Sequence, residues 1–292
     1  MRNRPRVTIV GAGKLGTVLA TSLHRAGYAI EQIVVRANPA SQRKARSLAK
    51  RVGARAVTMS QVRIESGVVW FCVPDDAIAG VAGLLARKAD WKNKVALHPS
   101  GALTSDKLAA LRRRGARVAS VHPMMTFVAG SPPSFPHPAF DGVPFAVEGD
   151  AMAVRASRAM VEALGGTAYK IRAQDKVAYH AWGTFASPLL TALLATTEQV
   201  AAAAGVKRRE AKRRMLPILR QTLANYAALD AAGSFSGPIV RGDVETVRRH
   251  LLALSRMPLA KEVYVALARA AGQYLPGKRK QRMHKLFGAE KK

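Results

Sequence analysis

Cysteine and long apolar runs are what this sequence has least of. One cysteine, Cys72, occurs in 292 residues, which excludes an internal disulfide and is typical of a reducing compartment. No stretch approaches the ~20 apolar residues that a membrane span needs. The N-terminal MRNRPRVTIV is not followed by the apolar core of a signal peptide. We therefore expect a cytoplasmic protein without a membrane partner.

Acidic residues are also scarce. Asp and Glu total 18 against 47 Lys and Arg, a formal net charge of +29. Such a charge attracts phosphorylated ligands and polyanions. The cations are scattered, and no zinc-finger spacing, ribonucleoprotein aromatic motif or helix-turn-helix accompanies them, which favours a solvated basic surface over a nucleic-acid site. The seven histidines lack zinc spacing and no G-x-S-x-G elbow occurs, so neither a metal site nor a hydrolase is predicted.

The first half of the chain alternates β-rich runs with helical patterns. Continuous apolar strands separated by helices are typical of a parallel sheet that is covered on both faces. We predict an α/β fold, a Rossmann-type doubly wound parallel sheet followed by an all-α domain. The predicted strands are 7–10, 32–36, 67–73, 94–98, 116–122, 144–148 and 168–171, and the helices between them are 14–26, 39–51, 76–88 and 150–164.

The second half, from about residue 174, shows only helical patterns. Pro188 is expected to kink or break the first of these helices. The Pro- and Gly-rich segment 128–142 is either a binding loop or a mobile connection. The predicted helices are 175–203, 207–229, 243–256 and 259–274.

Two domains and a C-terminal tail are predicted from these patterns. Residues 1–172 form a Rossmann-like dinucleotide-binding domain, and residues 173–275 form a helical domain for substrate binding and dimerisation. The helical half is rich in Ala and Leu and has no sheet to cover it, so we expect a homodimer. Residues 276–292 are expected to be a frayed basic tail.

A glycine motif, GAGKLG, follows the first strand directly. Gly11 permits a tight turn, Gly13 lets a pyrophosphate approach the backbone, and Gly16 lets helix and strand pack closely. The helix that starts at Lys14 and Leu15 then presents its N-terminal amides to the phosphates. Because the motif stands between a strand and a helix, it predicts a dinucleotide site.

Arg36 ends the second strand, where NAD-binding proteins carry an acid that binds the ribose 2′-hydroxyl. An acid would repel the 2′-phosphate of NADP, whereas a guanidinium holds phosphate with paired hydrogen bonds. Ser41 and Arg43 follow within reach of the same pocket. The pattern favours NADP(H) over NAD; the alternative is that Arg36 is one more cation on a basic surface.

Polar residues follow the next strands at the edge where open α/β sheets bind ligands. We expect Val73 and Pro74 to line the cofactor after the third core strand. His98 and Ser100 follow the next strand, and His122 ends another. The histidines either face the nicotinamide or satisfy backbone groups at strand ends.

Lys176 and His180 start the long helix of the second half. Their i, i+4 spacing places them on one helix face, and histidine is a residue type that commonly donates protons in enzymes. Hydride transfer to C=O or C=N leaves an atom that must be protonated, which these residues can supply. The alternative is a surface lysine beside a packed histidine. Further on, Asp243 is a predicted N-cap, and Arg241 either meets an anionic substrate or lies in a simple connection.

Six short sequence strings, in this order along the chain, carry a family resemblance: GAGKLG, VVWFCVPDDAI, HPSGAL, SVHPMMTF, KVAYHAWGTFASPLL and GPIVRGDVETVRRHL. They resemble bacterial proteins that join a Rossmann-like domain to a helical C-terminal domain of unknown function, over roughly residues 6 to 270. That family is similar in build to pyrroline-5-carboxylate reductase, deazaflavin-dependent NADP reductase and the 6-phosphogluconate dehydrogenase group.

The resemblance implies an NADP-linked oxidoreductase with substrate between two domains and a dimer formed through the helical one. Similar 3-hydroxyacid dehydrogenases use a helix Lys with an Asn four residues later. Lys176 fits that pattern, but His180 replaces the Asn, and Ser187 stands where an amide is expected.

Our first hypothesis is an NADPH-dependent reductase of a small anionic substrate that uses Lys176, His180, His98 and Ser100. A non-catalytic NADP-binding sensor and a nucleic-acid-associated protein are the alternatives. Steep weakening of binding with salt would favour the last of these.

Overall fold

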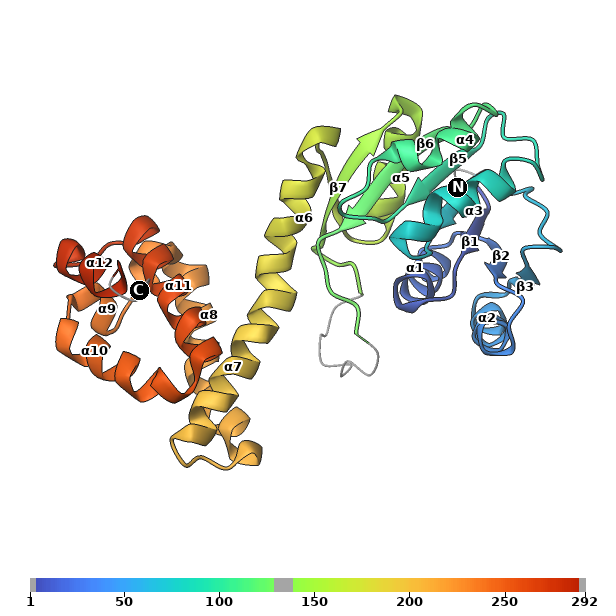
Figure 1. Ribbon diagram of the computed structural model, residues 1–292. Coiled ribbons are helices and arrows are strands. Elements are labelled where there is room, and N and C mark those ends of the chain that lie inside the picture. The colour runs from blue at the N-terminus through green and yellow to red at the C-terminus, as the bar shows by residue number, and fades with distance from the viewer. Residues whose placement is uncertain (1–3, 129–138, 289–292) are drawn as a thin grey trace. The chain divides into compact units, whose positions relative to one another are not determined.

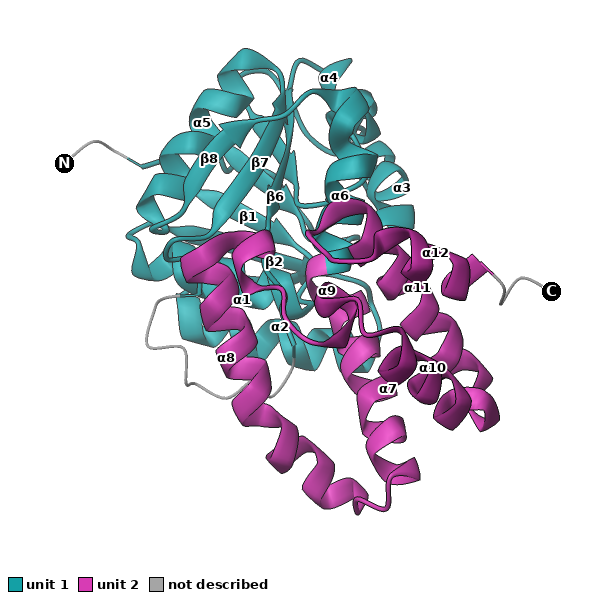
Figure 2. Ribbon diagram, turned by 90° about the vertical axis from the view of Figure 1, so that its left-hand side faces the viewer, with its two compact units in different colours: residues 1–185 teal, residues 186–292 magenta. Residues whose placement is uncertain are grey.

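Two compact units divide the chain in the computed structural model, which describes residues 4–128 and 139–288 (Figure 2). Unit 1 is Met1–Phe185 and unit 2 is Ala186–Lys292. The sequence placed this boundary one helix earlier, after residue 172. Helix α6, Lys176–Thr184, stays with unit 1 because Lys176 is hydrogen-bonded to groups at the strand ends. The predicted loop 128–142 lies mostly outside the described residues.

Unit 1 is built on an eight-stranded sheet in the order β3-β2-β1-β4-β5-β6-β7-β8 (Figure 1). Six of the seven neighbouring strand pairs are parallel, and β6 with β7 is the antiparallel pair among the described strands. All seven predicted strands are present, and the Rossmann-type α/β fold is confirmed. The strands are β1 Val7–Val10, β2 Ile30–Val35, β3 Arg55–Thr58, β4 Val68–Phe71, β5 Val95–His98, β6 Arg117–Pro123, β7 Pro144–Gly149 and β8 Thr167–Lys170.

Strand β3 is the strand that the sequence analysis missed. Among the described strands it pairs with β2 alone and lies at the edge of the sheet, with Arg55 exposed and its other residues half-buried. An edge strand needs no continuous apolar run, which is the signal by which the central strands were found.

Helices cover both faces of the sheet. Leu19 and Leu48 pack with Met160 in one core cluster, and Ile78 packs with Leu111 in the other. The first cluster uses α1, α2 and α5, and the second uses α3 and α4. The bounds are α1 Lys14–Arg25, α2 Pro39–Val52, α3 Asp75–Leu85, the 3₁₀ helix η1 Ser105–Leu108, α4 Ala109–Arg112 and α5 Ala151–Ala163.

Helix α2 shows why these boundaries are readable in the sequence. The side chain of Asn38 accepts a hydrogen bond from the Ser41 N–H at 2.8 Å, and Pro39 occupies the first turn. Gly53 ends the helix with φ 64°, the left-handed conformation that glycine adopts without strain. Local capping thus fixes the helix that follows Arg36.

Unit 2 contains only helices among its described residues, as predicted. Asp243 caps α10 by accepting from the Thr246 N–H at 3.1 Å, which confirms the predicted N-cap. The helices are α7 Leu190–Ala203, α8 Arg208–Ser234, α9 Pro238–Arg241, α10 Val244–Ala253, the 3₁₀ helix η4 Leu254–Arg256, α11 Pro258–Tyr274 and α12 Lys280–Gly288.

Two local irregularities have identifiable causes. Pro188 was predicted to kink or break the helix. It lies in a π-helical segment, Phe185–Leu189, where the helix forms a wider turn. In α8, Asp230 has φ 69° and breaks the helix where the predicted one, 207–229, ends.

The described residues of the C-terminal tail include a packed helix, contrary to the expectation of fraying. Helix α12 buries Met283 and Phe287, which pack with Val247, Leu251 and Val265. The two apolar residues recur at i and i+4, a helical period that the surrounding cations obscured in the sequence.

The long helices of unit 2 expose much apolar surface. Helix α7 has no buried residue among those described, and α8 has only Ala211. Over the described residues no single helix is long and apolar enough to cross a membrane. One pair of helical segments, Ala173–Ala203 and Arg208–Arg241, is bent by 119° at its break. Taken together, the two segments are long and apolar enough to cross a membrane by length and composition alone.

Candidate active site at the carboxyl edge of the sheet

The glycine turn after β1 has the geometry that a bound pyrophosphate requires. A Cβ atom at Gly11, where φ is +107°, would lie 2.2 Å from the Cys72 carbonyl oxygen, and one at Gly16 would lie 2.2 Å from the Gly11 carbonyl oxygen. A Cβ atom at Gly13 would meet nothing within 4 Å. Close packing thus requires glycine at positions 11 and 16, and Gly13 leaves open space in front of α1.

The N-terminus of α1 is free to accept an anion. No side chain caps it at Gly13, and its first turn holds no acid. The side chain of Lys14 is exposed, while Leu15 packs against the core and fixes the first turn. After β4, Val73 packs on the second core cluster, and Pro74 is the N-cap residue of α3. The residues present fit a dinucleotide.

Arg36 follows β2 directly and its side chain is exposed. Neither Arg36 nor Arg43 has a hydrogen-bond or ion-pair partner in the described part of the chain. The Ser41 N–H is used by Asn38, which leaves its hydroxyl as the group that a ligand can meet. An unpaired guanidinium at this strand end is suited to a phosphate dianion.

Beyond β4 and β5, a short hydrogen-bonded chain links two strand ends. The Ser100 hydroxyl donates to the Asp75 carboxylate at 2.6 Å and accepts from the Leu103 N–H at 3.0 Å. The Ser100 N–H donates to His98 Nδ1 at 3.2 Å, so the His98 proton lies on Nε2, which donates to the Thr104 carbonyl at 3.0 Å. These bonds fix the loop 98–104 beside α3.

Lys176 reaches this loop from the start of α6 and is completely buried. Its Nζ donates to the Ser100 carbonyl at 3.1 Å and to the Ser120 hydroxyl at 2.8 Å, and that hydroxyl donates to the Ser100 carbonyl at 3.1 Å. Burial lowers the pKa of Lys176 to about 8, although the charges of Glu148 and Asp75 oppose that change. The fold thus brings Lys176 and Ser100 together, and their roles in catalysis stay predictions.

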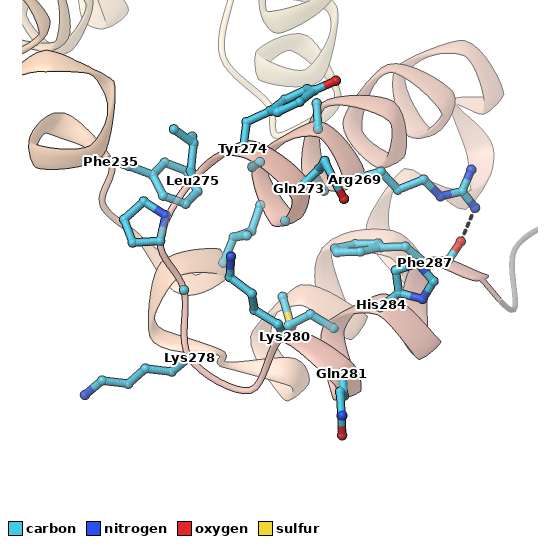
Figure 3. A pocket seen from close by; sticks show the side chains of 18 residues that line it. Phe235, Arg269, Gln273, Tyr274, Leu275, Lys278, Lys280, Gln281, His284 and Phe287 are labelled. Atoms are coloured by element: carbon cyan, nitrogen blue, oxygen red, sulfur yellow. Dashed lines mark hydrogen bonds between the residues drawn. The ribbon is translucent and has the colours of Figure 1, made fainter.

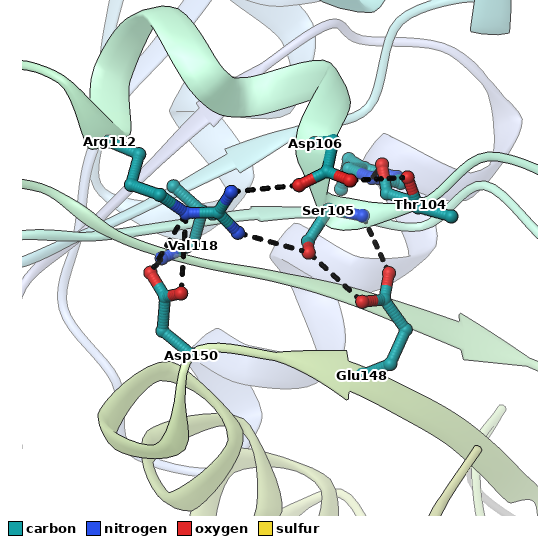
Figure 4. A network of polar contacts seen from close by, with 8 residues as sticks. Thr104, Ser105, Asp106, Arg112, Val118, Glu148 and Asp150 are labelled. Carbon is teal, nitrogen blue, oxygen red and sulfur yellow. Dashed lines mark hydrogen bonds and ion pairs between the residues drawn. The ribbon is translucent and has the colours of Figure 1, made fainter. Parts of the chain in front are cut away.

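A second polar network holds the other end of the same loop (Figure 4). The Glu148 carboxylate accepts from the Ser105 N–H at 2.5 Å and from its hydroxyl at 3.0 Å. Arg112 pairs with Asp106 at 2.8 Å and with Asp150 at 3.3 Å. Residues 98–105 are therefore held by hydrogen bonds at both ends of the loop.

The histidines of this edge differ in their surroundings. His98 is fully buried and uses both ring nitrogens within the protein, whereas His122 is partly exposed and His180 is exposed. The rings of His122 and His180 are 5.9 Å apart and nearly perpendicular. Burial lowers the pKa of both His98 and His122 to about 4, and the charge of Lys176 adds to the effect. Both imidazoles are neutral at pH 7.

Tyr179 is a site residue that sequence reasoning missed. It is buried, and its hydroxyl lies 3.1 Å from His122 Nδ1. Ser120 and Glu148 were missed as well. The available signal for Tyr179 was its i+3 spacing from Lys176, which places it beside the Lys176–His180 helix face.

The RGD segment of unit 2 forms a tight turn after α9. Gly242 has φ 69°, and a Cβ atom there would lie 2.6 Å from the Lys278 carbonyl oxygen. Arg241 is exposed, and its role toward a substrate stays a prediction.

A cavity of ≈ 590 Å³ also lies in unit 2, between α11 and α12 (Figure 3). Phe235, Ile239 and Phe287 form its apolar wall, and Lys278 extends away from it. None of the described residues that line it is Asp or Glu. Over residues 4–128 and 139–288, no group of three or more His, Cys, Asp or Glu residues is placed to hold a metal ion.

Two domain families match the sequence. Residues 1–123 match the Rossmann-like domain, and residues 143–271 match a domain of unknown function, DUF2520. The chain joins these two domains. This build is the one that the sequence strings resembled. No curated protein matches the chain.

Solved structures share the fold over nearly the whole chain. A candidate NADP oxidoreductase from Bacteroides fragilis is 21% identical with a TM-score of 0.74, and covers 91% of this chain and 97% of its own. A reductive aminase from Aspergillus terreus, solved with NADPH, is 18% identical with a TM-score of 0.66, over 98% and 100%. A pyrroline-5-carboxylate reductase from Coxiella burnetii is 14% identical with a TM-score of 0.57, over 97% and 99%. The chain thus shares its fold with these three structures.

Proposed function

We propose that this protein is an NADP(H)-dependent oxidoreductase that transfers hydride to the C=O or C=N group of a small anionic substrate. The observation that carries the proposal is one sheet edge where the open glycine turn, the unpaired Arg36 and the Asp75–Ser100–Lys176 network all lie. Ligands of open α/β sheets bind at this edge. When bound, NADPH supplies the hydride.

The cofactor would be held by groups that the chain leaves open. The N-terminal amides of α1 meet the pyrophosphate in front of Gly13. Arg36 forms the 2′-phosphate site with Ser41 and Arg43, because its paired donors match phosphate oxygens. Val73 and Pro74 lie along the path from the turn toward Ser100.

Lys176 acts through its neighbours rather than by touching substrate, because its side chain is completely buried. Its charge lies behind the Ser100 carbonyl and the Ser120 hydroxyl. A fixed positive charge near the reacting atom stabilises negative charge that develops there. The net charge of +29 favours an anionic substrate by the same electrostatics.

We also propose that the helical half forms a homodimer. Leu223, Tyr226 and Leu229 on α8 are 60%, 59% and 56% exposed, and Ile218 is 68% exposed. Exposed apolar side chains gathered on one helix are typical of a surface that a partner covers. A second copy of the chain is the partner that is always present.

Consumption of NADPH tests the proposed function. The purified protein is offered NADPH with 2-oxo acids, aldehydes and cyclic imines, and the loss of NADPH absorbance is followed. The control is the variant Gly13→Asp, which is designed to abolish NADPH binding without disturbing the fold. Aspartate is a good N-cap residue for α1, and its carboxylate repels the pyrophosphate.

We expect NADPH consumption by the wild type and none by Gly13→Asp. If the wild type binds NADPH but reduces none of these classes, hydride transfer is contradicted, and a non-catalytic NADP-binding role takes its place.

A further inference from the structure

The two histidines at the strand ends are not equivalent toward a ligand. Both ring nitrogens of His98 are bonded within the protein, so it has no atom to offer. His122 uses only Nδ1, and its Nε2 has no hydrogen-bond partner among the described residues. Of the two, His122 is therefore the one that can exchange a proton with a bound molecule.

Gly101 determines where His122 Nε2 is presented. A Cβ atom at Gly101 would lie 2.8 Å from His122 Nε2 and 2.4 Å from His180 Cδ2, so both rings approach the bare backbone of this residue. Ser100, its neighbour, is held by Asp75 and Lys176. The free nitrogen thus lies beside the fixed loop at the ligand-binding edge of the sheet.

Tyr179 fixes the orientation of the His122 ring. The two rings meet edge to face with centroids 5.5 Å apart, and the Tyr179 hydroxyl lies 3.1 Å from Nδ1. Tyr179 is 7% exposed, and the centroid of its ring lies 6.2 Å from that of Tyr169. Burial, together with a hydrogen bond to Tyr169, raises the pKa of Tyr179, so its hydroxyl is protonated before the reaction begins. With His122 also neutral, the pair is a chain of neutral hydrogen-bonding groups.

We propose that His122 is the catalytic residue that protonates the substrate heteroatom, and that Tyr179 is the positioning residue that holds its Nδ1. The inference rests on the proposed reductase function. As hydride adds to carbon, the C=O or C=N π bond breaks, and the heteroatom takes the proton of His122 Nε2. Nδ1 then takes the proton of the Tyr179 hydroxyl, which Tyr169 and solvent replace. A neutral imidazole acts here as the acid, as it can when its pKa is low.

Nitrogen NMR of histidine-labelled protein tests the positioning role without any substrate. The His122 signals are assigned by their loss in His122→Gln. We expect a single neutral tautomer in the wild type, protonated on Nε2, and an altered tautomer signature in Tyr179→Phe. Unchanged His122 signals in Tyr179→Phe would overturn the role of Tyr179.

Unit 2 provides a matched control. His250 Nδ1 lies 3.0 Å from the Tyr264 hydroxyl, with rings 5.9 Å apart, which is the same kind of pair away from the site. Tyr264→Phe should change the signals of His250 alone and leave NADPH consumption as in the wild type. Equal loss of activity in both tyrosine variants would show that a general structural effect, not the relay, is responsible.

Kinetics test the catalytic role. His122→Gln should lower kcat by about 10²-fold or more, as loss of a general acid does, and leave NADPH affinity unchanged. Tyr179→Phe keeps the packing and should lower kcat less. Full turnover in His122→Gln would overturn the proposal while the reductase function stands. A wild type that binds NADPH without turnover would instead overturn the reductase function.

Discussion

Unit 1 and unit 2 differ in how much of their apolar surface each buries by itself. In unit 1, Trp70 and Phe145 are 1% exposed within the first of its two core clusters. In unit 2, one cluster of six buried residues holds α10, α11 and α12, while α8 leaves Ile218 and Leu223 mostly exposed. The sheet of unit 1 is therefore covered within the unit itself, whereas α8 of unit 2 leaves large apolar side chains exposed.

The two units also differ in how far they bury their polar and charged groups, and unit 1 again buries more. Unit 1 buries Lys176, His98 and Glu148 in connected hydrogen bonds. The ion pairs of unit 2, such as Arg214 with Glu210, are exposed. Burying such groups is costly unless they are satisfied, and perturbed ionisable groups gather at functional sites. This difference supports the two proposals, that the reaction takes place in unit 1 and that the helices of unit 2 form the dimer.

The largest expected effect comes from a substitution in the core of unit 1. Phe145→Ala should lower the free energy of unfolding of unit 1 by about 3–5 kcal/mol, because it removes a ring packed against Phe140 and leaves a cavity. Denaturant unfolding followed by near-UV circular dichroism measures it. Leu223→Ala at low protein concentration is the comparison, and an equal loss there would contradict the contrast between the units.

A charge on α8 should break the proposed dimer. Leu223→Glu is expected to shift the protein from dimer to monomer in light scattering, because it desolvates a carboxylate in an apolar interface. Leu252→Glu is the control, since Leu252 is 66% exposed but lies on α10. A wild type that is monomeric at working concentration would contradict the proposal.

Acid should destabilise unit 1 through its buried histidines. The pKa values of His98 and His122 fall from 6.5 in the unfolded chain to about 4 in the fold, so the unfolded state binds more protons between these values. Stability is then retained above pH 6.5 and falls as the pH drops toward 4. Unfolding at a series of pH values should show this slope, and His122→Gln should reduce it. An identical slope in that variant would contradict the assignment.

The smallest expected effects are local and similar in both units. Asn38→Ala and Asp243→Ala each remove a side chain that caps a helix, and each should cost about 1 kcal/mol. Hydrogen exchange in the first turns of α2 and α10 measures the loss. Unchanged exchange in either helix would show that the cap does not hold that end.

Much of the fold was predictable because it depends on local signals. Continuous apolar runs identify the central strands, and Asn38, Pro39 and Gly53 mark the ends of α2. Strand β3 is too short and too exposed to give such a signal, and α12 hides two buried residues among cations.

The site was predictable in its location but not in its roles. The order of strands places Ser100 and His122 at one edge. The roles depend on side-chain packing between elements that are far apart in the sequence. This packing decides which imidazole has both nitrogens hydrogen-bonded, and it brings Tyr179 rather than Lys176 into contact with His122. Such contacts leave no periodic pattern to read.

Calorimetric titration with NADPH and NADH tests the central claim most directly, on the wild type, Arg36→Ala and Arg51→Ala. Arg51 is an exposed arginine in the last turn of α2 and serves as the control for charge alone. We expect NADPH to bind more tightly than NADH, the preference to vanish in Arg36→Ala, and Arg51→Ala to keep it. Failure of both nucleotides to bind the wild type would contradict the account of this sheet edge.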